Sequence, residues 1–174
     1  MQIRKAIQAD LPALMAFYQE MEQELGKQPF LPQGNRGGFP TRTMVEAAIA
    51  AGWQALGEED GEIAGSYFLD HHGDPAYAFA PWKVEAKSEE VMVLHALRVL
   101  PAYGGRGYAR ALVSHAIETA RSLGQKAIRL DCLEGNHVPM KMYLSCGFSH
   151  VGTAEITYAD IGVPRIFHLF ELPL

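Results

Sequence analysis

The chain has 174 residues, and 48% of them are hydrophobic, which is enough for one packed core. Its formal net charge of -5 argues against nucleic acid as a partner and favours a cationic substrate such as an amine. The N-terminal segment contains no long apolar run, and two cysteines cannot build a disulfide framework. We therefore expect a cytoplasmic protein with no signal peptide and no membrane span.

Strands and helices alternate along the predicted fold. Asp10 can cap an amphipathic helix over residues 11–25, and a second helix begins at Thr41 or Thr43. The segment 26–40 is rich in Gly and Pro and predicts a loop, which is a candidate lid or wall of a substrate site. Strands are predicted at 3–7, 53–57, 62–71, 91–99, 127–133, 149–157 and 166–172, with a long helix at 109–123.

The stretch from Val99 to Ala109 joins the strand at 91–99 to the long helix. Gly105 and Gly107 stand at this junction, where glycine allows a tight turn and a close approach to the backbone. The first turn of a helix offers unpaired N–H groups and the positive end of the helix dipole. The sequence therefore predicts a binding site for a phosphate or pyrophosphate group.

Two other pyrophosphate motifs fit this stretch less well. A P-loop ends in Gly-Lys-Ser/Thr, and the chain has no such sequence. A dinucleotide fingerprint needs Gly or Ala where this chain has Arg110, and it follows the first strand rather than a late one. A nicotinamide or flavin cofactor is therefore disfavoured.

A second motif runs from Asn136 to Phe148. Asn136 is a good N-cap, and Pro139 falls in the first helical turn, where its missing N–H does no harm. Gly147 can end the helix in a left-handed conformation. The pattern predicts a short helix that presents Tyr143.

The two motifs together resemble the GCN5-related N-acetyltransferases, the GNAT superfamily. The matches to its loop are Val99, Pro101, Gly105, Gly107 and Ala109, and the second motif matches its downstream signature. Gly104 departs from the family, which usually has Gln or Arg there. The resemblance implies one α/β domain over residues 1–174, with a mixed, splayed sheet flanked by helices. It also implies acetyl-CoA as the acetyl donor.

Acetyl transfer to an amine needs a proton acceptor for the amine and a proton donor for the departing thiolate. Tyr143 is the candidate acid, because a phenol with a pKa near ~10 stays protonated at neutral pH. His95 is the candidate base, since the strand at 91–99 carries no carboxylate where relatives have a Glu. The alternatives are an inert, half-buried His95, a role for Glu89 or Glu90 through water, or no dedicated base.

The resemblance also implies the cofactor contacts. Backbone groups of Leu97, Arg98 and Val99 are expected to hold the acetyl carbonyl and the pantetheine arm. Asn136 is expected to cap its helix, contact the cofactor, or both. The predicted pyrophosphate loop comprises Gly104, Gly105, Arg106, Gly107, Tyr108, Ala109 and Arg110.

The acceptor is expected to be a small-molecule amine that attacks directly in a ternary complex. Its walls are predicted at 26–40, 70–82 and 158–164. No metal site is expected, because the adjacent His71 and His72 point in opposite directions on a strand. The apolar strand at 166–170 predicts either a homodimer interface or a buried strand. The alternative function is a non-catalytic acyl-CoA-binding sensor or scaffold.

Overall fold

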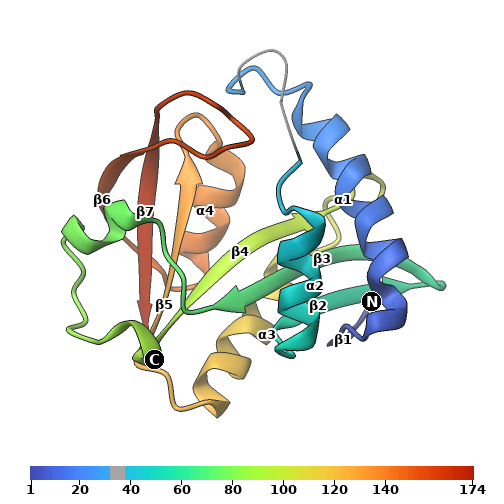
Figure 1. Ribbon diagram of the computed structural model, residues 1–174, viewed down its shortest axis with the longest axis horizontal. Coiled ribbons are helices and arrows are strands. Elements are labelled where there is room, and N and C mark those ends of the chain that lie inside the picture. The colour runs from blue at the N-terminus through green and yellow to red at the C-terminus, as the bar shows by residue number, and fades with distance from the viewer. Residues whose placement is uncertain (32–37) are drawn as a thin grey trace.

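A computed structural model describes residues 1–31 and 38–174 of the chain. Within these residues the centre is a seven-stranded sheet in the order β1-β2-β3-β4-β5-β7-β6 (Figure 1). Neighbouring strands are antiparallel, except that β4 and β5 run parallel. The strands are β1 (Gln2–Lys5), β2 (Gln54–Glu59), β3 (Glu62–Asp70), β4 (Val91–Val99), β5 (Ala127–Leu133), β6 (Ser149–Ile156) and β7 (Arg165–Pro173).

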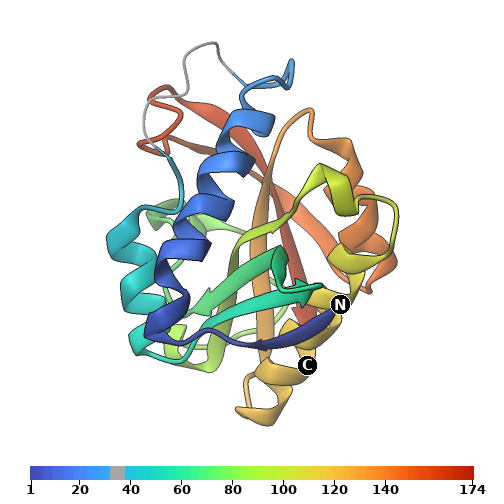
Figure 2. The ribbon, with the colours of Figure 1, turned by 90° about the vertical axis from the view of Figure 1, so that its right-hand side faces the viewer.

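Helices cover both faces of the sheet (Figure 2). α1 (Leu11–Leu25) and α2 (Arg42–Ala50) pack on one face, in a cluster that contains Phe68 of β3. α3 (Tyr108–Ser122) and α4 (His137–Ser145) pack on the other, in a cluster that contains Leu94 of β4. We call these the α1 face and the α3 face. No helix within residues 1–31 and 38–174 combines the length and apolar character needed to cross a membrane.

β4 and β5 are paired only near their N-terminal ends. Residues 91–93 of β4 pair with residues 127–129 of β5, and beyond them the two strands diverge (Figure 1). β4 continues along β3 as far as Val99, while β5 continues along β7 as far as Leu133. We call the point of divergence the β4–β5 fork. The expected mixed, splayed sheet flanked by helices is confirmed.

A bulge in β4 lies just beyond the fork. Ala96 has a φ of 49°, and the register with β3 shifts between Ser66 and Phe68. Because of this extra residue, His95 and Ala96 both face α1: the His95 ring stacks on Phe68, and Ala96 belongs to the cluster under α1 and α2. The bulge therefore sets which side chains of β4 reach each face.

Two local features differ from the sequence-based expectation. The Asp10 side chain does not cap α1; it accepts from the N–H of Ile7 and pairs with Arg4 instead. β7 lies between β5 and β6, and four of its apolar side chains are buried there. This position accounts for the apolar pattern of residues 166–170 within one chain, and a homodimer stays a prediction.

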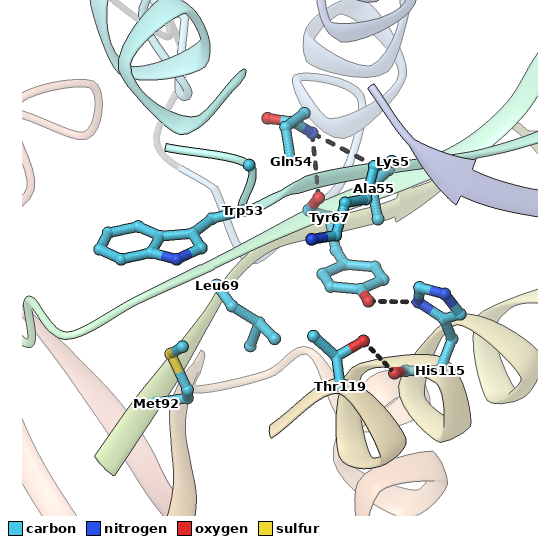
Figure 3. A pocket seen from close by; sticks show the side chains of 10 residues that line it. Lys5, Trp53, Gln54, Ala55, Tyr67, Leu69, Met92, His115 and Thr119 are labelled. Carbon is cyan, nitrogen blue, oxygen red and sulfur yellow. Dashed lines mark hydrogen bonds between the residues drawn. The ribbon is translucent and has the colours of Figure 1, made fainter. Parts of the chain in front are cut away.

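A small cavity of about 20 Å³ lies between the sheet and α3 (Figure 3). At its edge, the Tyr67 hydroxyl and His115 Nδ1 form a 2.6 Å hydrogen bond that joins β3 to α3. Burial lowers the pKa of His115, with a smaller lowering by Lys5 and an opposing effect of Glu118. This hydrogen bond of the neutral imidazole thus holds the helix that begins at the predicted pyrophosphate loop.

We expect this pair to make the fold sensitive to acid. The unfolded chain takes up a proton on His115 near pH 6.5, before the folded chain does, so the free energy of unfolding falls as the pH drops below 6.5. His115→Gln should lower the free energy of unfolding by about 1 kcal/mol at neutral pH. It should also make that free energy depend less steeply on pH. Urea unfolding between pH 7.5 and pH 5 measures both, with the exposed His137→Gln as control. An equally steep decline in His115→Gln would contradict the assignment.

Candidate functional site

The loop before α3 presents a row of unpaired backbone donors. The N–H groups of residues 105–110 form no hydrogen bond within the part of the chain that the structure describes. Gly105 and Gly107 have φ angles of 74° and 79°, and α3 begins directly after them at Tyr108. A Cβ on either glycine would meet no atom within 4 Å. Free donors, open space and the positive end of α3 together fit a pyrophosphate group.

The departure at Gly104 has a structural explanation. Pro101–Tyr103 forms a 3-10 turn, which the N–H of Gly104 closes by donating to the Pro101 carbonyl. A Cβ on Gly104 would lie only 3.0 Å from that carbonyl oxygen. The side chain of Gln or Arg, which the family usually has at this position, would therefore crowd the turn. Gly104 avoids this contact and leaves the row of N–H donors at 105–110 unchanged.

The two arginines of the loop differ in their surroundings. The Arg106 guanidinium lies 3.2 Å from a carboxylate oxygen of Glu59 and stacks over the Tyr103 ring. Arg110 is exposed, with no ion pair among the described residues. The backbone N–H of Arg106 is therefore a better candidate contact for a phosphate than its side chain, whereas Arg110 can contribute its charge.

The predicted contacts on β4 lie beyond the fork. Leu97, Arg98 and Val99 keep β3 as a neighbour, but their other side no longer faces β5. The Leu97 carbonyl accepts a 3.0 Å hydrogen bond from the Arg98 side chain. This open strand edge could pair with an extended amide-containing ligand as another strand would.

His95 is held by Asp70, the first residue of the predicted 70–82 wall, and this pairing was not predicted from the sequence. His95 Nε2 lies 2.9 Å from Asp70 Oδ1, at the end of the neighbouring strand β3. Burial raises the pKa of Asp70, but the contacts with His95 and the N–H of His72 outweigh it, and the pKa lies below its usual value. Asp70 thus stays ionised, orients the imidazole and leaves Nδ1 as the free nitrogen.

The glutamates considered as alternative bases lie elsewhere. Glu90 pairs with Lys126 at 2.7 Å, and it precedes the end of β4 that is paired with β5. Glu89 belongs to the same 3-10 turn, Ser88–Glu90. Both are therefore at the closed end of the strand pair, away from the fork.

Tyr143 lies on the α3 face and is almost completely buried. Its ring packs against Phe148 and Phe170, in the core cluster that also contains Cys132, and 7% of the residue is exposed. The hydroxyl forms no hydrogen bond with any described residue, yet it is not among the fully enclosed unpaired atoms. Burial raises the pKa of the phenol, so it stays protonated at neutral pH. Tyr143 is therefore a free proton donor.

Asn136 does not cap α4 with its side chain. It stands at the N-cap position, but its ψ of 69° differs from the extended conformation of most N-caps, and no side-chain capping bond forms. The capping part of the prediction is wrong, and the amide is left for other contacts. Gly147 has a φ of 95° and ends α4 as predicted.

A second carboxylate, Asp131, faces the fork and was missed. It is part of β5, and the hydroxyls of Tyr77 and Tyr158 both donate to its Oδ2, at 2.8 Å and 2.5 Å. The signal in the sequence was a charged residue inside an otherwise apolar strand, which needs partners when it is buried. Tyr77 and Tyr158 come from two of the three predicted acceptor walls.

The third predicted wall is described in part. Residues 32–37 of the 26–40 segment lie outside the described residues. Phe39, which follows them, has its ring 6.2 Å from that of Tyr158. The described residues contain no group of three or more His, Cys, Asp or Glu side chains arranged to hold a metal.

Comparison with known proteins identifies the family. Residues 12–148 match the acetyltransferase (GNAT) family. The chain belongs to the GNAT acetyltransferase family. GNAT acetyltransferases use acetyl-CoA, so the cofactor prediction is confirmed together with the family. A search of curated proteins found no match.

Solved structures agree with this fold. A GNAT acetyltransferase from Streptococcus agalactiae superposes with a TM-score of 0.76 at 17% identity, over 99% of this chain and 95% of the other. A ribosomal-protein-alanine N-acetyltransferase from Brucella melitensis gives 0.73 at 20% identity over the whole of both chains. yncA from Salmonella typhimurium, solved with its cofactor acetyl-CoA, gives 0.72 at 20% identity, over 100% and 94%.

We expect Gly107→Ala to weaken acetyl-CoA binding about 5- to 30-fold. An L-residue in the left-handed region costs about 1–2 kcal/mol, and the added methyl group enters the open space beside the donors. Gly124→Ala is a matched control, because Gly124 follows α3 with a φ of 68° and similar free space. Calorimetric titration should show weaker binding only for Gly107→Ala, with both variants destabilised. Equal affinities in the two variants would contradict the loop assignment.

Proposed function

We propose that this GNAT acetyltransferase transfers the acetyl group of acetyl-CoA to the primary amine of a small molecule, by direct attack in a ternary complex. The observation that carries the proposal is the arrangement at the fork. His95 is part of β4 just beyond its pairing with β5 and faces α1, whereas Tyr143 lies on the α3 face, in the same core cluster as Leu94 of β4. A proton can be taken up on one face and delivered on the other.

Different segments of the chain are suited to different parts of acetyl-CoA. The N–H groups of residues 105–110 are suited to the pyrophosphate, and the free edge of Leu97–Val99 to the pantetheine arm and acetyl carbonyl. Asn136, with its amide uncommitted, is a further candidate contact. Bound acetyl-CoA supplies an activated thioester, whose C–S bond breaks as the C–N bond of the amide forms.

The proton transfers follow from the two side chains. A protonated amine must lose a proton before it can attack, and His95 Nδ1 accepts it while Asp70 holds the ring through Nε2. Tyr143 donates its hydroxyl proton to the leaving sulfur. The nitrogen loses a second proton as the amide forms, and a proton returns to the Tyr143 phenolate. For each protonated amine, one proton therefore ends on coenzyme A and one is released to water.

One observation supports a small acceptor rather than a protein terminus. Aromatic side chains surround the α1 side of the fork, with Phe39, Tyr77 and Tyr158 close to one another or to Asp131. The net charge of -5 also favours a cationic substrate. We further propose that residues 1–174 form one domain, because the sheet runs from Gln2 to Pro173. The low cysteine content supports the proposal that it acts in the cytoplasm.

An amine panel tests the function. The protein is incubated with acetyl-CoA and alkylamines, arylamines, diamines, amino acids or a peptide with a free N-terminus. Thiol release and product mass are recorded. The proposal predicts stoichiometric thiol and N-acetylated small amine, with no acetylated enzyme. Acetyl-CoA binding without acetylation of any amine would instead support a non-catalytic sensor, and preference for the peptide would contradict a small acceptor.

A further inference from the structure

The Asp131 site gives a more specific inference, which rests on the proposed function. We propose that Asp131, framed by Tyr77 and Tyr158, receives the protonated amino group of the acceptor. The acceptor is accordingly a basic aliphatic amine, charged at neutral pH, rather than a weakly basic arylamine.

The strand register places Asp131 opposite His95. Val93 and Arg129 are the last parallel pair, and His95 and Asp131 each lie two residues beyond it. Side chains two residues apart on a strand share a face. Tyr77 confirms the orientation, because it packs with Val93 and donates to Asp131. The carboxylate and the proposed base therefore flank the fork from β5 and β4, on the acceptor side.

Only one of the two carboxylate oxygens of Asp131 accepts hydrogen bonds from the described residues. Both tyrosine hydroxyls donate to Oδ2, and Oδ1 accepts no hydrogen bond from any residue that the structure describes. The tyrosines are themselves fixed, since Tyr77 packs against Trp82 and Tyr158 against Phe167. A rigid carboxylate with a free oxygen, between aromatic rings, is a receptor for a compact ammonium group.

The surrounding charges also favour a cation. His95 and Arg98 of β4 are the basic groups near the site, while Asp74 and Asp160 are acidic groups on the loops that carry the two tyrosines. Asp70, which is hydrogen-bonded to His95, is a further carboxylate beside the site. Four carboxylates, counting Asp131, thus surround a site with one guanidinium and one imidazole. Once the ammonium is held by Oδ1, the neighbouring His95 can remove the proton that blocks attack.

The experiment compares two isomeric amines, benzylamine and 4-methylaniline. They have the same atoms, but only benzylamine is protonated at neutral pH. For the wild type, we expect a lower KM for benzylamine. Asp131→Asn keeps an acceptor for both tyrosines and removes the charge, so it should raise the KM for benzylamine about 10- to 100-fold. The KM for 4-methylaniline should not change. Asp60→Asn, in the remote β2–β3 turn, is the control with the same substitution.

A binding measurement separates this inference from the proposed function. The carboxyl ¹³C resonance of Asp131, assigned by its loss in Asp131→Asn, should shift with benzylammonium and not with 4-methylaniline. A shift of this resonance without acetylation of any amine would support the ammonium site at Asp131 and contradict the proposed function. If both amines are acetylated and Asp131→Asn leaves the KM of each amine unchanged, the proposed function would be supported and the ammonium site would be contradicted. Absence of both shift and acetylation would overturn both.

A second variant tests whether the tyrosines hold the charged carboxylate. Burial raises the pKa of Asp131, and the hydrogen bonds from Tyr158 and Tyr77 lower it. Tyr158→Phe should therefore raise this pKa further, so that the KM for benzylamine begins to increase at a higher pH as the solution is acidified. An unchanged pH dependence in Tyr158→Phe would contradict this positioning role.

Discussion

Tyr143→Phe should lower kcat by about 10²- to 10⁴-fold and leave the affinity for acetyl-CoA unchanged. The ring stays packed beside Cys132 and Phe170, so the substitution removes only a hydroxyl with no partner among the described residues. That hydroxyl is the proposed proton donor to the departing sulfur, and general acids contribute this much to rate. Steady-state kinetics and a calorimetric titration of acetyl-CoA measure the two quantities separately.

Tyr67→Phe is the matched control for this experiment. Tyr67 is also buried on the α3 face, but its hydroxyl bonds to His115. We expect this control to lose about 1 kcal/mol of stability and to keep its kcat. A Tyr143→Phe variant with the wild-type kcat would show that the proton on the sulfur comes from elsewhere.

His95→Gln should produce the second large effect, a fall of about 10²- to 10⁴-fold in kcat together with loss of the acid limb of the pH–rate profile. Glutamine can still donate to Asp70, but it cannot accept a proton at neutral pH. Asp70→Asn should cost less, about tenfold, because it weakens a charge-assisted hydrogen bond that only orients the base.

The profile of kcat against pH decides between His95 and the alternatives. His115→Gln is the control, since it removes a histidine from the α3 face without touching the fork. We expect its profile to match the wild type. An acid limb that persists in His95→Gln would assign the base to another group or to water.

Local patterns predicted much of the fold. β4 and β5 begin and end where the apolar runs do, at residues 91–99 and 127–133, because each run is bounded by polar or turn residues. Gly105, Gly107 and Gly147 adopt the positive φ angles that their places in the motifs require. In each of these cases, the information lies within a few neighbouring residues.

The missed features depend on contacts between distant segments. Asp70 is 25 residues from His95, and only the pairing of β3 with β4 brings the two together. Asp131 is 54 residues from Tyr77, and this contact depends on where the 3-10 turn Pro75–Phe79 lies against β5. The bulge at Ala96 also puts the adjacent residues His95 and Ala96 on one face, which a two-residue alternation cannot reveal. The Asn136 cap failed for a different reason: the residue type was suitable, but the backbone entered α4 at another angle.

The central claim is that the loop before α3 and the β4–β5 fork form an acetyl-CoA site. Isothermal titration of the protein with acetyl-CoA, with NAD as the control ligand, tests it most directly. The structure predicts saturable binding of one acetyl-CoA per chain and no binding of NAD. An absence of acetyl-CoA binding, or equal binding of the two ligands, would contradict the claim.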